Sequence, residues 1–125
     1  MTHSFYNCML VAAGGAAGAV CRYLMGFMPF KQYAQYPINT LIVNIIGTFL
    51  IGFISSCAHR HADADPRWIL FLQIGFCGGF TTLSSVTLEF LELNNMGQYV
   101  TAVAYYAATI ILCAFATWGG VASGR

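Results

Sequence analysis

The chain has 125 residues, of which 58% are hydrophobic and only 7% are charged. A typical soluble domain is about 25% charged, so a fold of this size could not cover its surface in water with so few charges. The formal net charge of +1 comes from scattered basic residues, which argues against a nucleic-acid-binding surface. The composition therefore indicates a protein embedded in a lipid bilayer.

Four apolar segments are each long enough to cross the hydrocarbon as a helix, which takes about 20 residues. Their approximate ranges are 6–28, 38–57, 68–90 and 99–121. Pro29, Pro37 and Pro66 stand beside the ends of these segments, where proline stops or opens a helix. We therefore expect an all-α membrane protein with one four-helix domain over residues 1–125, too small to enclose a wide pore unless it oligomerises.

The third segment contains the sequence Gly75-Phe-Cys-Gly-Gly-Phe-Thr-Thr-Leu-Ser-Ser-Val-Thr-Leu-Glu89, in which glycines come directly before hydroxyl residues. Gly78 and Gly79 weaken a helix at a depth where lipid cannot satisfy a free backbone group. Irregular backbone is tolerated there only where it faces protein or a water-filled cavity. The sequence therefore predicts a helix that breaks in mid-membrane near 78–81, with an ion or substrate pathway beside it.

Polar side chains within the predicted spans are costly and mark candidates for function. Thr81, Ser84 and Ser85 have the i, i+3, i+4 spacing that places hydroxyls on one helix face. Serines also satisfy the backbone of their own helix, so a purely structural role fits them too. Asn44 lies in the middle of the second span and carries both donors and an acceptor. An interhelical clamp and a pore-lining donor are both compatible with it.

Two charged residues lie inside the predicted spans. Arg22 stands near the end of the first span, where snorkelling to the interface, pairing with a carboxylate and attraction of anions to a pore mouth all fit. Glu89 follows the hydroxyls of the third span by one turn. A mouth residue, a proton acceptor and a solvated helix end are all compatible with Glu89.

The end of the second span and the polar loop after it (59–65) alternate residue types that bind divalent metals. These are Cys57, His59, His61, Asp63 and Asp65. A solvated loop between helices has the same composition, and no defined metal motif is matched. We expect a solvated loop.

Three motifs follow one another in the first three spans. They are Gly14-Gly-Ala-Ala-Gly-Ala-Val-Cys-Arg-Tyr23, Asn39-Thr-Leu-Ile-Val-Asn-Ile-Ile-Gly47 and Gly75-Phe-Cys-Gly-Gly-Phe-Thr-Thr-Leu-Ser84. In these motifs the chain resembles the small bacterial fluoride channels, the Fluc family, also called CrcB. The resemblance implies a multi-pass protein of the inner (plasma) membrane that exports fluoride down its electrochemical gradient, and not an enzyme. It also implies a dual-topology dimer of two antiparallel subunits with two pores.

The resemblance further implies roles for individual residues. A structural sodium ion is expected at the dimer centre, held by the backbone carbonyls of Gly78 and Thr81. The implied ion pathway has a basic residue, an amide, hydroxyls, two aliphatic residues and a carboxylate. These are Arg22, Thr40, Asn44, Leu83, Ser84, Ser85, Val86, Thr87 and Glu89.

The chain departs from the family pattern on the third helix, where Leu83 and Val86 replace two phenylalanines. An aromatic ring edge is electropositive and suits an anion, whereas aliphatic side chains have no such quadrupole. Two alternatives follow: a homodimer with an altered pore, or a partner-dependent, non-conducting subunit of a heterodimer whose paralogous chain supplies the aromatics. A small multidrug-type transporter is a third alternative, but the first span lacks the carboxylate that its proton exchange requires.

Overall fold

The computed structural model describes residues 1–29 and 36–125. Within them, four helical segments are long and apolar enough to cross a membrane. They are Thr2–Met25 (α1), Ile38–Arg60 (α2), Pro66–Asn95 and Tyr99–Ser123 (α6). The chain is therefore a multi-pass membrane protein built from helices.

The first helix begins earlier and ends earlier than the apolar pattern suggests. The range expected from the sequence was 6–28, whereas α1 covers Thr2–Met25. Beyond its end the turn tightens, because the N–H of Phe27 bonds to the carbonyl of Leu24 at 3.1 Å and the N–H of Met28 to that of Met25 at 3.2 Å. Such i to i+3 bonds satisfy the last carbonyls without continuing the α-helix.

The third membrane segment is divided into four pieces. They are α3 (Pro66–Ile69), η2 (Leu70–Cys77), α4 (Gly78–Phe80) and α5 (Leu83–Asn95). Asp65 caps α3 by accepting the N–H of Arg67 at 3.0 Å. The turns of η2 are wider, with π-helical i to i+5 hydrogen bonding, a form that is frequent beside functional sites.

Two residues with extended backbone separate α4 from α5. Thr81 has φ −78° and ψ 155°, and Thr82 has φ −151° and ψ 110°. The hydroxyl oxygen of Thr82 accepts the N–H of Ser85 at 3.1 Å, so Thr82 is the N-cap of α5. The interruption thus lies at the end of the glycine-rich stretch, with the chain restarting at a threonine cap.

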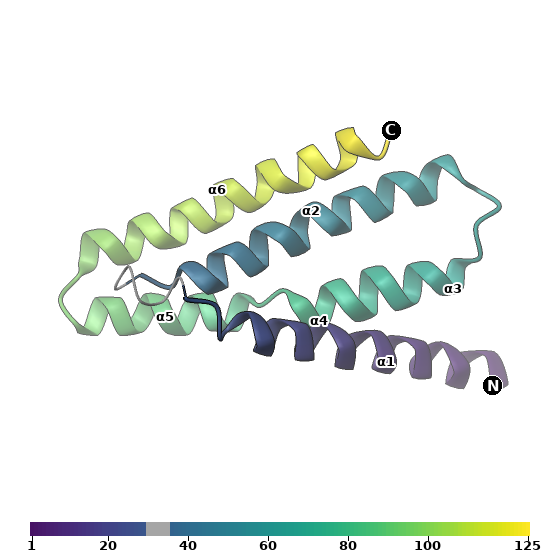
Figure 1. The fold of residues 1–125 in the computed structure, drawn as a ribbon, viewed down its shortest axis with the longest axis horizontal. Helices are drawn as coiled ribbons and strands as arrows, with labels where there is room; N and C mark the ends of the chain where they lie inside the picture. Colours follow the sequence, from purple (N-terminus) through teal and green to yellow (C-terminus); the bar gives the residue numbers. More distant parts are fainter. Residues whose placement is uncertain (30–35) are drawn as a thin grey trace.

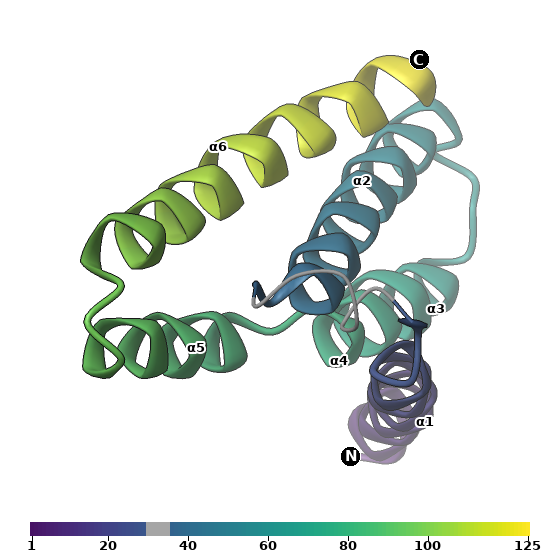
Figure 2. The ribbon, with the colours of Figure 1, turned by 60° about the vertical axis from the view of Figure 1, so that its left-hand side comes forward.

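The helices form two packed groups, which are linked mainly by contacts of α2 with η2 and of α6 with α5. α2 lies along α6, and α1 lies along η2 and α4 (Figure 1). α5 contacts α6 and leads away from α1 (Figure 2). The amino and carboxyl termini lie at the same end of the long axis, opposite the α5–α6 connection (Figure 1).

Glycines permit the closest helix approaches. A Cβ added at Gly18 would collide with the carbonyl oxygen of Phe76, and one added at Gly120 with that of Phe49. Small residues at such crossings let the two backbones pack directly against each other. In lipid, where the hydrophobic effect does not drive helices together, this packing stabilises their association. The pairs α1–η2 and α2–α6 are therefore held by backbone proximity.

One cluster of buried apolar side chains lies between α5 and α6 and consists of Val86, Leu93, Ala102 and Tyr105. Val43, Cys77 and Phe80 are buried as well. By contrast, large apolar side chains such as Phe115 and Trp118 of α6 are exposed. Such an exterior suits lipid or another apolar helix rather than water.

Candidate functional site

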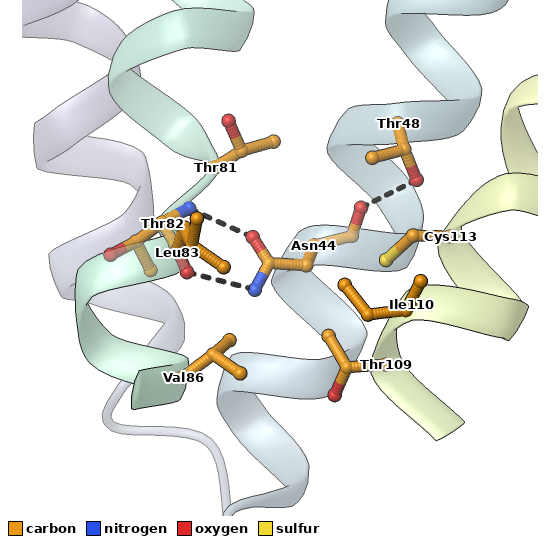
Figure 3. A pocket seen from close by; sticks show the side chains of 9 residues that line it. All are labelled: Asn44, Thr48, Thr81, Thr82, Leu83, Val86, Thr109, Ile110 and Cys113. Carbon is orange, nitrogen blue, oxygen red and sulfur yellow. Dashed lines mark hydrogen bonds between the residues drawn. The ribbon is translucent and has the colours of Figure 1, made fainter. Parts of the chain in front are cut away.

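The side chain of Asn44 bridges α2 to the interruption of the third segment (Figure 3). Its Nδ2 donates to the carbonyl oxygen of Thr82 at 3.1 Å, and its Oδ1 accepts the N–H of Thr82 at 2.8 Å. Because Thr82 is extended, its N–H and its carbonyl are not paired within a helix. Asn44 therefore replaces the two hydrogen bonds that the break removes.

One N–H of the Asn44 amide has no hydrogen-bond partner among the described residues. The side chain is only 6% exposed, and the hydroxyl of Thr48 donates to its backbone carbonyl at 2.7 Å. An asparagine amide has two N–H groups, of which the contact with Thr82 uses one. The clamp is thus part of the fold, while the pore-lining role of Asn44 stays a prediction that the second N–H permits.

A pocket of about 220 Å³ lies beside this contact, between α2, the interruption, α5 and α6 (Figure 3). It is lined by Asn44, Thr48, Thr81, Thr82, Leu83, Val86, Thr109, Ile110 and Cys113. No carboxylate or basic side chain is among them. The pocket is therefore a neutral space with amide, hydroxyl and thiol groups on apolar walls.

The threonine hydroxyls of the pocket are engaged with their own helices. Thr81 donates to the carbonyl of Cys77 at 2.9 Å, and Thr109 to that of Tyr105 at 2.8 Å. Both carbonyls also accept backbone hydrogen bonds within their helices, so the hydrogen bonds from the threonine hydroxyls are weak. A hydroxyl can rotate from this position toward an ion that enters the pocket.

The two positions where the family pattern has phenylalanine both line the pocket but differ in exposure. Val86 is 0% exposed and belongs to the core cluster, whereas Leu83 is 61% exposed. A larger side chain therefore has room at Leu83 and not at Val86.

The hydroxyls of α5 are arranged differently from the expectation. Because Thr81 is extended and bonds to Cys77, the expected face shared by Thr81, Ser84 and Ser85 is wrong. Thr82 takes that place, with its Oγ1 at 3.1 Å from the Oγ of Ser84 and 3.0 Å from that of Ser85. Thr87 is exposed, outside the pocket lining, and donates to the carbonyl of Ser84 at 3.0 Å.

Glu89 connects three helices through its carboxylate. Its Oε1 accepts the hydroxyl of Thr40 on α2, and its Oε2 accepts the hydroxyl of Tyr105 on α6, both at 2.6 Å. The side chain is half-buried. Of the roles left open by the sequence, a merely solvated helix end does not fit these contacts.

Arg22 lies in the last turn of α1 and is half-buried. Among the described residues its guanidinium forms no ion pair, so pairing with one of their carboxylates is not seen. A cation near a helix carboxyl terminus is favoured by the helix dipole. Arg22 is also outside the pocket lining, and its role at a pore mouth stays a prediction.

The carbonyl oxygens of Gly78 and Thr81 have lost their helical donors. The N–H of Thr82, which would serve Gly78, donates to Asn44, and the N–H of Ser85, which would serve Thr81, donates to the hydroxyl of Thr82. Gly78 is also exposed in the single chain. Hard cations bind such oxygen ligands, so the two carbonyls fit the donor set expected for sodium.

Residues 57–65, which cover the end of α2 and the loop after it, do not assemble a metal site. Within the described part of the chain, no three histidine, cysteine or acidic side chains come close enough to hold a metal ion. Asp65 instead caps α3 and lies 3.9 Å from the guanidinium of Arg67. The side chains from His59 to Asp65 are exposed.

Sequence reasoning missed the contribution of α6 to the site. Thr109 and Cys113 line the pocket, and Tyr105 binds Glu89. The signal was an i, i+4 repeat of polar residues along the fourth span, which places one side chain per turn on the same face. The members of this repeat are Thr101, Tyr105, Thr109, Cys113 and Thr117.

Comparison with known proteins identifies the family. Residues 9–121 match the family model described as CrcB-like protein, Camphor Resistance (CrcB). The chain is 37% identical over 118 residues to the fluoride-specific ion channel FluC of Sulfurihydrogenibium sp. (strain YO3AOP1), covering 94% of this chain and 95% of the relative. It is 40% identical over 117 residues to FluC of Chlorobium chlorochromatii (strain CaD3), covering 94% and 91%. It is 38% identical over 118 residues to FluC of Rhizobium meliloti (strain 1021), covering 94% of each. The chain belongs to the CrcB family.

Proposed function

We propose that this protein is a fluoride-selective ion channel, not an enzyme, and that it lets fluoride leave the cytoplasm down its electrochemical gradient. The observation that carries the proposal is the neutral pocket at the helix break, clamped by Asn44, in a chain whose relatives are named fluoride-specific ion channels. The expected location is the inner (plasma) membrane of the cell.

The chemistry of the pocket suits a small, strongly hydrated anion. Such an ion needs a donor at each step to replace the water that it loses. Amide and hydroxyl groups do this without a fixed positive charge that would trap the ion, and conduction requires sites weak enough to leave. The free N–H of Asn44 and the rotatable hydroxyls of Thr48 and Thr109 are donors of this kind.

The active unit that we propose is a dimer of two antiparallel copies with two pores. Two features support a second subunit: the pocket wall at Leu83 is exposed in a single chain, and so is Gly78 beside the interruption. A structural sodium ion between the copies would bind the carbonyl oxygens of Gly78 and Thr81. When bound, the ion would add a positive field for a nearby anion.

A second candidate function rests on the pocket walls. Leu83 and Val86 offer aliphatic groups where an anion would benefit from an electropositive ring edge. A paralogous subunit that contributes aromatic side chains at the interface would complete the pathway in a heterodimer. In that case this chain alone would conduct poorly.

Fluoride efflux from liposomes that contain only the purified chain tests both functions. The homodimeric channel predicts rapid fluoride efflux and no chloride efflux under the same gradient. Efflux that requires co-reconstitution with a paralogous chain would favour the heterodimer. Efflux of neither ion, with or without that chain, would refute both.

A further inference from the structure

The carboxylate of Glu89 controls where two hydroxyl hydrogens point. An ionised carboxylate only accepts hydrogen bonds, so the hydrogens of Thr40 and Tyr105 must both be directed at it. The two distances of 2.6 Å have the length of hydrogen bonds from a hydroxyl to a charged oxygen. Because each hydroxyl has a single hydrogen, neither has one left for a passing anion.

This group of three residues lies one helical turn beyond the pocket on every helix involved. On α2, Thr40 precedes Asn44 by one turn, and on α6, Tyr105 precedes Thr109 by one turn. On α5, Glu89 follows Val86 by three residues, about 4.5 Å along the axis. An anion that moves from the pocket toward the α5–α6 connection therefore meets the Glu89 carboxylate next.

The charge of Glu89 is not balanced by an ion pair within residues 1–29 and 36–125, where Arg67 and Asp65 form the pair that the structure contains. Both groups that contact Glu89 from α2 and α6 are neutral hydroxyls. A negative charge beside the path repels an anion, and the repulsion is stronger in a half-buried site than in water.

We propose that Glu89 limits the passage of anions: it adds a repulsive charge one turn from the pocket and withholds the hydroxyl hydrogens of Thr40 and Tyr105. The inference rests on the proposed channel function and assigns to Glu89 a rate-limiting role rather than the role of an ion ligand. Neutralising Glu89 without changing its shape should speed conduction. A residue that only held the helices together would slow conduction when altered.

The test is fluoride efflux from liposomes that contain the full chain with Glu89→Gln. Glutamine keeps one acceptor oxygen and turns the other into a donor, so one hydroxyl hydrogen is released and the charge is removed. We expect efflux to be roughly three- to tenfold faster than for the unmodified chain, as removal of one half-buried charge predicts. Glu92→Gln is the matched control, because Glu92 is an exposed carboxylate one turn further along α5, and efflux should change less than about twofold.

A second variant tests whether the faster efflux of Glu89→Gln depends on the hydroxyl of Tyr105. With Tyr105→Phe, that hydroxyl is missing, and the gain from Glu89→Gln should become smaller. If Glu89→Gln does not yield a monodisperse protein, Glu89→Met offers a neutral side chain of similar length with the same expected direction.

Equal or slower efflux in a folded neutral variant, beside a conducting unmodified chain, would overturn this inference and leave the channel function standing. A gain of the same size with Glu92→Gln would also overturn it, because a general surface-charge effect would then suffice. If the unmodified chain and the Glu89 variants all fail to pass fluoride, the channel function itself is refuted together with this inference.

Discussion

Asn44 on α2 pairs with both backbone groups of Thr82, the residue at which the third membrane segment leaves the helical hydrogen-bond pattern. The pairing explains how a break is stable inside an apolar protein. An unsatisfied backbone group in hydrocarbon costs several kcal/mol, so the break needs a partner that supplies one donor and one acceptor. An asparagine side chain supplies both at one point.

Replacing Asn44 by leucine should therefore impair both stability and flux. Two buried backbone groups of Thr82 would lose their partners, at a cost of about 1–3 kcal/mol each. We expect a lower melting temperature in detergent and loss of fluoride efflux. Ile46→Leu is the control, because Ile46 is exposed on the same helix. A variant with unchanged melting and unchanged efflux would contradict the clamp.

Aromatic substitution on α5 should act differently at its two positions. Leu83→Phe adds a ring edge at an exposed pocket wall, so efflux should rise while the protein stays assembled. Val86→Phe inserts the same ring into a fully buried position, where overpacking costs about 1–3 kcal/mol. Size-exclusion chromatography and efflux measured together separate the two effects. Robust fluoride-selective efflux by the unmodified homodimer, unaltered by Leu83→Phe, would show that ring edges are not required.

Two neighbouring glycines of α6 offer a matched test of helix packing. A Cβ at Gly120 would collide with the carbonyl oxygen of Phe49, whereas a Cβ at Gly119 would meet only the ring of Phe49 at 4.0 Å. Gly120→Ala should destabilise the protein by about 1–3 kcal/mol, and Gly119→Ala should leave it unchanged or slightly more stable. Thermal unfolding followed by tryptophan fluorescence measures the difference. Equal stability of the two variants would argue against the close approach of α2 and α6.

Removal of sodium tests the proposed ion at Gly78 and Thr81. If their carbonyls bind sodium between two subunits, purification with N-methylglucamine in place of sodium should lower efflux and weaken the dimer, because freed carbonyls would face each other. Restoring sodium should reverse the loss, and potassium serves as the control cation. Dimerisation and efflux that do not depend on the cation would exclude a structural role for sodium.

Much of the architecture follows from the sequence alone. Charge content and the lengths of four apolar runs are enough to predict the membrane class and the helix number, because the bilayer sets both. The glycines at 78–79 also indicated where the third helix would weaken, and the three motifs indicated the family. Helix ends such as Met25 were less predictable, since the last turn can tighten without any change in hydropathy.

The partners of the polar residues were decided only by the tertiary structure. The sequence left Asn44 between two roles and Glu89 among three, because residue spacing gives the face of a helix but not what packs against it. Asn44 and Thr82 are 38 positions apart in the sequence, and Thr40 and Glu89 are 49 positions apart. Both contacts depend on how α2 crosses α5. The hydroxyl beside Ser84 and Ser85 belongs to Thr82 rather than Thr81, because both threonines are extended and α5 restarts with Thr82 as its N-cap.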